Sequence, residues 1–192
     1  MITDRRRFGN GGMAALVAQV RAAAAAGVQL VQLRERDLDG RELFDLAVRV
    51  VAAVAGTSTR VVINDRLDVA LAAGAHGVHL RASSFPPARV RRLAPPGFLI
   101  GQSVHSAAAA TACTQGADYL LFGNVFETTS KMGKPAAGLV QLAAVVRSTP
   151  LPVLAVGGVA LERVPQILAA GAAGVAGISF FHDGAVPRID GT

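Results

Sequence analysis

The stretch GADYLLF at residues 116–122 determines the fold expected for this chain. It places a glycine after an alanine-rich stretch and before a short apolar run. A glycine in this place suits the end of a helix, because a positive φ causes no Cβ clash there. The apolar run is typical of a strand that is buried on both faces. The stretch therefore predicts a helix followed directly by a buried strand.

The same pattern recurs at residues 27–30, 74–77 and 171–174. Successive glycines lie roughly 40 to 55 residues apart, about twice the length of one strand-plus-helix unit, so a further strand is expected in each interval. The expected strands are residues 2–4, 30–33, 60–64, 77–80, 98–103, 119–122, 152–156 and 174–178. The expected helical segments are residues 12–26, 39–55, 67–73, 86–93, 107–115, 139–147 and 161–170.

This strict alternation predicts a parallel sheet covered by helices. Eight such units in residues 1–192 indicate a single α/β domain, a compact (β/α)₈ TIM barrel. A doubly wound open sheet is the alternative. The first strand is short, and residues 179–192 are poor helix material, so we expect an irregular tail and a reduced or missing last helix. An uncovered barrel flank would expose apolar surface, which predicts a homo-oligomer.

Composition narrows the classes of partner. The 192 residues are 52% hydrophobic, carry a formal net charge of +6 and include one cysteine, Cys113. The chain has no apolar run of the roughly 18–20 residues that span a bilayer and no signal-like start. We therefore expect a cytoplasmic protein without a membrane partner. The basic excess lies at residues 5–7 and 89–92, where we expect solvent-facing arginines. Aromatic residues are only 5%, which argues against nucleic acid and favours a small phosphorylated ligand.

Polar residues follow the expected strands, and the carboxyl ends of barrel strands form the active-site rim. Two pairs, Gly157-Gly158 and Ile178-Ser179, suit phosphate, because bare backbone lets N–H groups approach an anion. A tight turn is the alternative interpretation of the glycine pair. The other rim residues are Asp4, Arg34, Glu35, Arg36, Asn64, Asp65, Arg66, His79, Arg81, Ser103, His105, Asn124 and Glu127.

Seven segments then point to a family. They are QLRERD at 32–37, VINDR at 62–66, GVHL at 77–80, SVHS at 103–106, GADY at 116–119, FGNVFET at 122–128 and AVGGV at 155–159. In order and spacing the chain resembles the thiamine-phosphate synthase/TenI superfamily of thiamin biosynthesis. The FGNVFET loop is more similar to that of TenI-type thiazole tautomerases. The resemblance implies a site for thiazole phosphate, held by the backbone at Gly157, Gly158, Ile178 and Ser179.

The main hypothesis is a TenI-like thiazole tautomerase, which shifts a proton to aromatise the thiazole carboxylate phosphate and requires no cofactor. Where such enzymes carry a histidine, this chain has Asn124, and an amide cannot act as a general base. His105, Glu127 or His79 would then move the proton. His105 is preferred, because imidazole titrates nearest to neutral pH. A buried structural histidine is the alternative reading of His105.

Two further functions stay open. A thiamine-phosphate synthase would join hydroxymethylpyrimidine diphosphate to thiazole phosphate and release pyrophosphate. The resemblance then assigns the diphosphate substrate to Arg34, Arg36, Asn64, Ser103 and Lys131, and Mg²⁺ to Asp65, with Ser84 at the place of a second magnesium-binding aspartate. The other alternative is a non-catalytic protein that binds thiazole phosphate or thiamin phosphate.

Overall fold

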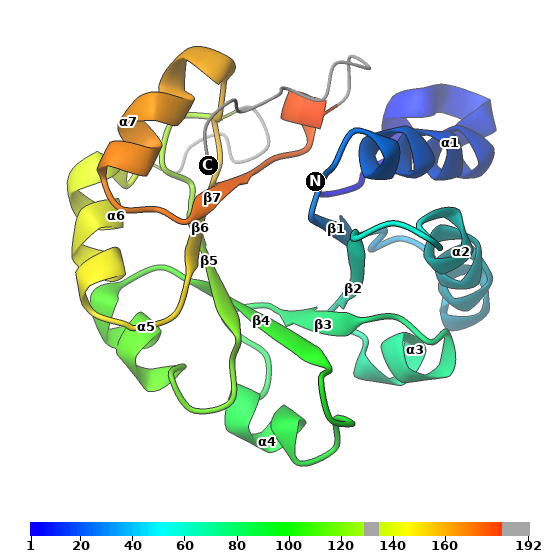
Figure 1. The fold of residues 1–192 in the computed structure, drawn as a ribbon, viewed down its shortest axis with the longest axis horizontal. Helices are drawn as coiled ribbons and strands as arrows, with labels where there is room; N and C mark the ends of the chain where they lie inside the picture. The colour runs from blue at the N-terminus through cyan, green and yellow to red at the C-terminus, as the bar shows by residue number, and fades with distance from the viewer. Residues whose placement is uncertain (129–134, 182–192) are drawn as a thin grey trace. The chain divides into compact units, whose positions relative to one another are not determined.

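The computed structural model describes residues 1–128 and 135–181, apart from the side chains of residues 10 and 11. In this part of the chain, parallel strands alternate with helices (Figure 1), and the strands follow one another in the sheet in chain order, from β1 to β7. The strands are β1 Leu30–Leu33, β2 Arg60–Asn64, β3 Gly77–Leu80, β4 Leu99–Val104, β5 Tyr119–Gly123, β6 Val153–Val156 and β7 Gly174–Ala176. The helices are α1 Gly12–Ala25, α2 Gly40–Ala53, α3 Leu67–Ala72, α4 Pro87–Arg91, α5 Ala107–Ala112, α6 Gly138–Arg147 and α7 Val164–Ala169.

The first expected strand is reduced to a single parallel bridge between Ile2 and Gln32. Thr3 N donates to Gln32 O at 3.0 Å, and Gln32 N donates to Met1 O at 2.9 Å. Seven strands and this bridge therefore occupy the eight predicted strand positions. The other element ends differ from the expected ones by a few residues, and 3₁₀ turns stand at Leu161–Arg163 and Ser179–Phe181. The rest of the expected irregular tail lies outside the described residues.

The glycines of the repeated pattern have the predicted conformation. Their φ angles are +86° at Gly27, +65° at Gly74, +99° at Gly116 and +91° at Gly171. Gly116 is also required by packing, because a Cβ there would lie 2.6 Å from the backbone nitrogen of Ala88. At this position the glycine both ends a helical segment and lets α4 approach the start of β5.

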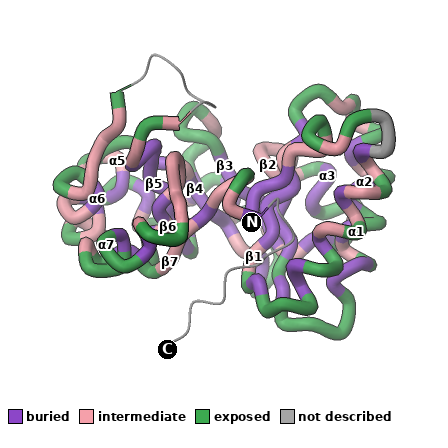
Figure 2. Tube along the Cα trace, turned by 90° about the horizontal axis from the view of Figure 1, so that it is seen from above, coloured by how far each residue is buried: buried purple, intermediate pink, exposed green. Residues whose placement is uncertain are grey.

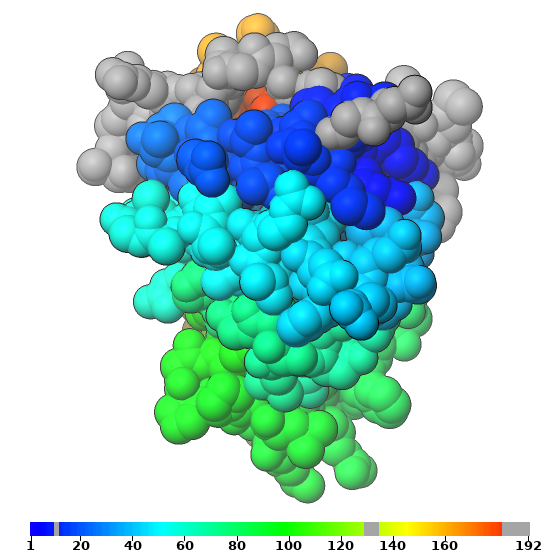
Figure 3. All heavy atoms as spheres, turned by 90° about the vertical axis from the view of Figure 1, so that its right-hand side faces the viewer, coloured from blue at the N-terminus to red at the C-terminus, as the bar shows by residue number. Residues whose placement is uncertain are grey.

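The contacts divide the chain into two compact units, residues 1–78 with 178–192 and residues 79–177. In the first unit α1 packs against α2 and α2 against α3. Their inward faces carry fully buried residues such as Leu16, Leu46 and Val50, and β2 contributes Val61 and Ile63. Figure 2 shows this buried path along β1 and β2, and Figure 3 shows α1 and α2, blue to light blue, at the surface.

Helix α2 begins at a capping box. Asp39 accepts from Glu42 N at 2.9 Å, and the Glu42 carboxylate accepts from Asp39 N at 3.2 Å. Two backbone donors that the helix leaves unpaired are thereby satisfied. The sequence DLDGRE before an apolar helix is sufficient to encode this helix start.

Of residues 5–7, Arg6 and Arg7 are exposed as expected from their charge, whereas Arg5 is half-buried. The three residues begin a 3₁₀ helix, Arg5–Gly11. Arg5 donates two hydrogen bonds to Asp37, at 2.7 and 3.0 Å, and lies 3.4 Å from Glu35. Arg6 pairs with Asp4 at 2.8 Å. The acidic residues that follow two neighbouring strand segments hold these arginines in place.

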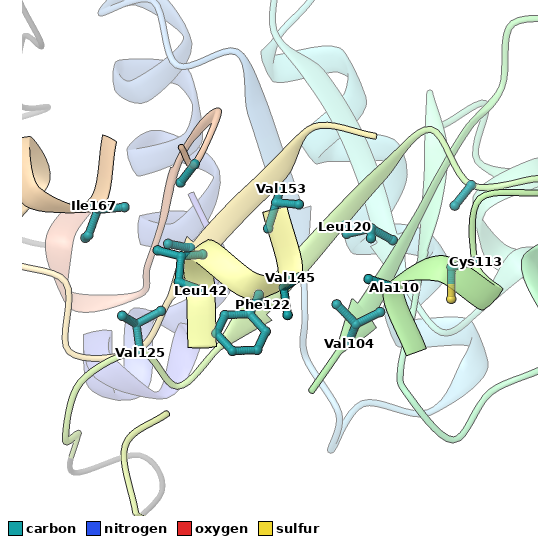
Figure 4. Packing of buried hydrophobic residues seen from close by; sticks show 13 residues of the cluster. Val104, Ala110, Cys113, Leu120, Phe122, Val125, Leu142, Val145, Val153 and Ile167 are labelled. Atoms are coloured by element: carbon teal, nitrogen blue, oxygen red, sulfur yellow. The ribbon is translucent and has the colours of Figure 1, made fainter. Parts of the chain in front are cut away.

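The core of the second unit lies between β4, β5, β6 and the helices α5, α6 and α7. Phe122 of β5, at 1% exposure, packs with Leu142 and Val145 of α6 (Figure 4). Val153 of β6 and Ile167 of α7 extend the same cluster. Cys113 belongs to it as a buried free thiol, and burial raises the pKa of that thiol. Its place agrees with the small core residue that a lone cysteine most often is.

Arg91 is a second exception to the solvent-facing arginines expected. Its guanidinium donates to Phe98 O at 2.6 Å and to Gly116 O at 3.1 Å, and it pairs with Asp118. The Asp118 carboxylate also accepts from Ile100 N at 2.7 Å. Arg91 therefore ties α4 to the amino-terminal ends of β4 and β5.

Among the described residues, no helix is long and apolar enough to cross a membrane.

His76 gives the first unit a pH-dependent contribution to stability. Its backbone N donates to Val61 O at 2.8 Å, and its Nδ1 accepts from Val61 N at 2.9 Å, so this nitrogen must be unprotonated. Burial, and to a lesser degree the charge of Arg60, lowers the pKa of His76 below its ordinary value of 6.5. The unfolded chain then takes up the proton more readily than the folded one.

We therefore predict that His76→Ala costs about 1 kcal/mol of unfolding free energy at pH 7.5. The stabilisation is present above pH 6.5 and is lost as the pH falls through the lowered folded-state pKa. Urea unfolding of both proteins from pH 7.5 down to pH 5 would show the two stabilities converging. A difference that stays constant or grows on acidification would contradict this role.

Candidate active site

The residues predicted for the site lie at or just after the carboxyl ends of strands, as the barrel topology requires. In the first unit they are Arg34 and Arg36 after β1, Asn64 and Asp65 at the end of β2, and Ile178 and Ser179 after β7. In the second unit they are Ser103 and His105 at β4, Asn124 and Glu127 after β5, and Gly157 and Gly158 after β6. Lys131 lies outside the described residues.

Arg34 is a half-buried cation in the first unit. Burial, with a smaller contribution from the charge of Arg36, lowers the pKa of its guanidinium. The neighbouring carboxylate of Glu35 accepts from Thr3 Oγ1 and, at 3.0 Å, from Arg5 N. Asp4, in turn, is paired with Arg6. Within the described part of the chain the Arg34 side chain has no hydrogen bond or ion pair, so it is available to a bound anion.

Asn64 and Asp65 stand beside this cation at the strand ends. Leu33 of β1 is the register partner of Ile63, so Asn64 and Arg34 come next on neighbouring strands. Asp65 has a φ of +59°, and no other described residue except glycine has a positive φ. Such left-handed backbone is tolerated by aspartate and concentrates at functional sites. The turn after β2 therefore holds the Asp65 backbone in a left-handed conformation that residues other than glycine rarely adopt.

In the second unit, a hydrogen-bonded chain of side chains joins three strands. His79 Nε2 lies 2.9 Å from Ser103 Oγ, and His79 Nδ1 lies 3.0 Å from the Tyr119 hydroxyl. His79 is 1% and Tyr119 7% exposed, whereas Ser103 is half-buried. Burial, and the nearby charge of Asp118, raises the pKa of Tyr119, so this hydroxyl keeps its proton. The chain runs from the interior to the strand end, where Ser103 is partly accessible.

The Tyr119 ring occupies space that Gly101 leaves open. Gly101 and Tyr119 are register partners on β4 and β5, and a Cβ on residue 101 would overlap the tyrosine ring. The ring centroids of His79 and Tyr119 lie 5.6 Å apart at 34°. The glycine thus sets where the tyrosine hydroxyl meets the histidine.

His105 is exposed, so the buried structural histidine considered above is wrong. Its Nδ1 lies 2.9 Å from Gly123 O. A carbonyl oxygen only accepts, so Nδ1 donates, and in the neutral ring Nε2 carries the lone pair. The bond orients the His105 ring at the end of β4.

Asn124 is part of a fixed turn. Its side chain is 7% exposed, and its Nδ2 donates to Phe126 O at 3.3 Å. Its backbone oxygen accepts from Ala137 N at 2.9 Å. The amide therefore holds the loop after β5. Glu127, by contrast, is exposed.

The glycine pair after β6 is required by its surroundings. Gly157 and Gly158 have φ of +95° and +64°. A Cβ on Gly157 would lie 2.5 Å from the Asn124 Cβ, and one on Gly158 would lie 2.5 Å from Glu127 O. Backbone N–H groups on such side-chain-free turns are the arrangement that binds oxyanions.

Ile178 and Ser179 do not continue a strand, contrary to the expected range 174–178. β7 ends at Ala176, and Ser179 begins a 3₁₀ turn whose Phe181 N donates to Ile178 O at 3.4 Å. Gln19 of α1 donates to Phe181 O at 2.8 Å and anchors this turn within the first unit.

Sequence reasoning missed Tyr119 and Gly101. Both occupy alternate positions of strands whose other face is the apolar cluster around Phe122. A polar residue and a glycine at corresponding positions of two neighbouring strands were the available signal. That signal needs the register of the strands, which the sequence does not display.

The fold and its polar strand ends define a TIM-barrel protein, and comparison with known proteins defines which kind. Residues 1–181 match the family model described as thiamine monophosphate synthase. The chain belongs to this family, which confirms the resemblance found in its sequence.

Its relatives agree with this placement. A putative thiamine-phosphate synthase of Geobacter sulfurreducens is 47% identical over 182 residues, which cover 93% of this chain and 84% of the relative. A thiamine-phosphate synthase of Methanoculleus marisnigri is 46% identical over 161 residues, 83% of this chain and 76% of the relative. The structure of thiamine phosphate pyrophosphorylase from Pyrococcus furiosus matches with a TM-score of 0.79 at 34% identity, covering 93% of this chain and 83% of that one.

We predict that Gly158→Ala is more destabilising than Gly97→Ala. Both positions have a positive φ, +64° and +76°, but a Cβ at Gly97 meets nothing within 4 Å. The difference therefore isolates the collision with Glu127 O, expected to cost about 1–3 kcal/mol. Denaturant unfolding of the two variants measures it. Equal losses of unfolding free energy in the two variants would show that the loop after β5 moves to accommodate the Cβ without cost.

Proposed function

We propose that the protein is a thiamine-phosphate synthase, which joins hydroxymethylpyrimidine diphosphate to thiazole phosphate and releases pyrophosphate. The observation that carries this proposal is the half-buried Arg34 guanidinium, which has no ion pair among the described residues. The neighbouring carboxylates of Glu35 and Asp4 are bonded to Arg5 and Arg6 instead. Relatives named putative thiamine-phosphate synthase and thiamine-phosphate synthase support the same choice. This reverses the ranking drawn from the sequence, which placed the tautomerase first.

A diphosphate is the ligand that suits the cations of the first unit. Arg34 and the exposed Arg36 follow the same strand, and their mutual repulsion contributes to the lowered pKa of Arg34. A multiply charged anion relieves both the repulsion and the desolvation. Guanidinium groups bind phosphate oxygens with two parallel hydrogen bonds. Lys131 remains a proposed third cation.

These groups serve the reaction by stabilising the leaving group. As the bond between the pyrimidine methylene carbon and the bridging oxygen breaks, the electron pair leaves on pyrophosphate. Positive groups already in place stabilise the charge that develops there. The thiazole nitrogen then forms a bond to the electron-deficient carbon. We assign the thiazole phosphate to the backbone of Gly157, Gly158, Ile178 and Ser179, and the diphosphate substrate also to Asn64 and Ser103.

The residues present fit a magnesium ion held largely by the substrate. No group of three or more His, Cys, Asp or Glu side chains able to hold a metal occurs among the described residues. Asp65 offers one carboxylate, whereas the Ser84 hydroxyl accepts from Arg81 N at 3.0 Å. Mg²⁺ commonly rests on one or two carboxylates plus substrate phosphate oxygens. When bound, it would neutralise charge on the diphosphate, and Asp65 is the residue that would hold it.

A thiazole tautomerase is the second candidate, and the geometry of His105 favours it. Its Nδ1 donates to Gly123 O, which orients the ring at an exposed strand end. Asn124 cannot replace the family's histidine, because an amide does not titrate near neutral pH. Proton transfer in this reaction would thus require His105 or Glu127. The third function, a non-catalytic binding protein, is an outcome of the experiment below.

The test mixes the protein with hydroxymethylpyrimidine diphosphate, thiazole phosphate and Mg²⁺ and follows thiamin phosphate. We expect product, and a loss of about 10- to 100-fold in kcat/KM for Arg34→Met, because charge-assisted bonds to the diphosphate are removed. Arg41→Met is the matched control, since Arg41 is an exposed arginine that pairs with Asp45 on α2.

Binding of thiazole phosphate without product would overturn the synthase. Aromatisation of the thiazole carboxylate tautomer would then identify the tautomerase. Binding without either reaction would identify a binding protein.

Because position 84 is a serine, we predict that the protein binds Mg²⁺ weakly and that one substitution tightens this binding. Ser84→Asp restores a second carboxylate, and we expect the Mg²⁺ concentration for half-maximal synthase activity to fall several-fold. Ser83→Asp, on the exposed neighbour, adds the same charge one residue away and serves as control. Equal shifts for the two variants would attribute the effect to general electrostatics.

A further inference from the structure

We infer that Tyr119 and His79 act as positioning residues that make Ser103 a hydrogen-bond donor to the substrate. The inference rests on the proposed function for its substrate, the phosphorylated pyrimidine, and on the geometry of the second unit for its direction. The hydrogen-bonded chain Tyr119–His79–Ser103 runs over 3.0 and 2.9 Å.

The direction of the chain follows from where the tyrosine hydrogen goes. Tyr119 is 7% exposed and keeps its proton, because burial raises its pKa. His79 Nδ1 is the only partner of its hydroxyl among the described residues. A buried donor left unpaired is costly, so the hydroxyl donates to Nδ1. Nδ1 must then carry the lone pair, and the neutral ring carries its hydrogen on Nε2.

Ser103 completes the chain. Nε2–H donates to Ser103 Oγ, which leaves the serine hydrogen to point elsewhere. Ser103 is half-buried near the carboxyl end of β4, and its hydroxyl has no other partner in the described part of the chain. The serine therefore presents a donor. Pyrimidine ring nitrogens and diphosphate oxygens are acceptors and can bind this donor. An amino group on the ring is itself mainly a donor and would bind poorly to the serine hydrogen.

The opposite direction is disfavoured by the same accounting. If Ser103 donated to Nε2, then Nδ1–H would donate to the tyrosine oxygen. The tyrosine hydrogen would then have no acceptor among the described residues, although Tyr119 is buried, at 7% exposure. The tyrosine hydroxyl, far from the strand end, thus determines which kind of substrate atom the serine selects.

A double-mutant cycle tests the coupling. Tyr119→Phe keeps the ring beside Gly101 and removes the hydroxyl, and we expect kcat/KM to fall about tenfold. The kcat/KM of Ser103→Ala should fall further. The kcat/KM of the double variant should equal that of Ser103→Ala, because without the serine the tyrosine has nothing to orient. Ser103→Thr should recover much of the activity. Losses that multiply in the double variant, or no loss in Tyr119→Phe, would overturn the inference.

A measurement independent of activity separates this inference from the proposed function. Long-range ¹H–¹⁵N NMR of the histidine rings reports which nitrogen carries hydrogen. We expect His79 to be the neutral Nε2–H form in the wild type and to lose that strong preference in Tyr119→Phe. His105, bonded through Nδ1–H to Gly123 O, should show the opposite form and is the internal control. An Nδ1–H form of His79 would overturn the inference, whether or not the protein makes thiamin phosphate.

Discussion

The register between β4 and β5 is the constraint on which the second unit depends. It places Gly101 opposite Tyr119, and two residues further along it places Ser103 opposite Leu121. Because side chains alternate along a strand, Val104 and Phe122 face the helices while Ser103 and Tyr119 face the other side. A shift of one residue would turn Ser103 toward the apolar cluster and Val104 toward the face that carries Tyr119. Apolar packing and the polar chain are thus fixed by one set of backbone hydrogen bonds.

In the first unit, the corresponding constraint is which arginines the acidic residues pair with. Asp4, Glu35 and Asp37 are each committed to Arg5 or Arg6, so Arg34 keeps its charge without a carboxylate partner. The 3₁₀ helix after the first bridge therefore does more than connect two elements. By holding the acids, it preserves a cation for an anionic ligand.

Much of the fold was predictable because helix ends and buried strands are encoded locally. The glycine pattern and the capping box at Asp39 located most elements, and polar residues after strands gave candidate positions for the site. Interactions distant in sequence were not predictable in this way. Arg5 and Arg91 were expected to face solvent, and their acceptors lie at other strand ends. Tyr119 was read only as part of a strand, since its partner His79 is 40 residues away. Self-association and a cytoplasmic location stay predictions.

The fit of the Tyr119 ring over Gly101 has a consequence for how such chains can diverge. Any side chain at position 101 would collide with the Tyr119 ring where it lies in this structure. A lineage that gains even a methyl group at the first position must first shrink the second, and in doing so it gives up the phenol that His79 meets. The two positions should therefore change together through evolution, with the loss of the glycine following the loss of the tyrosine.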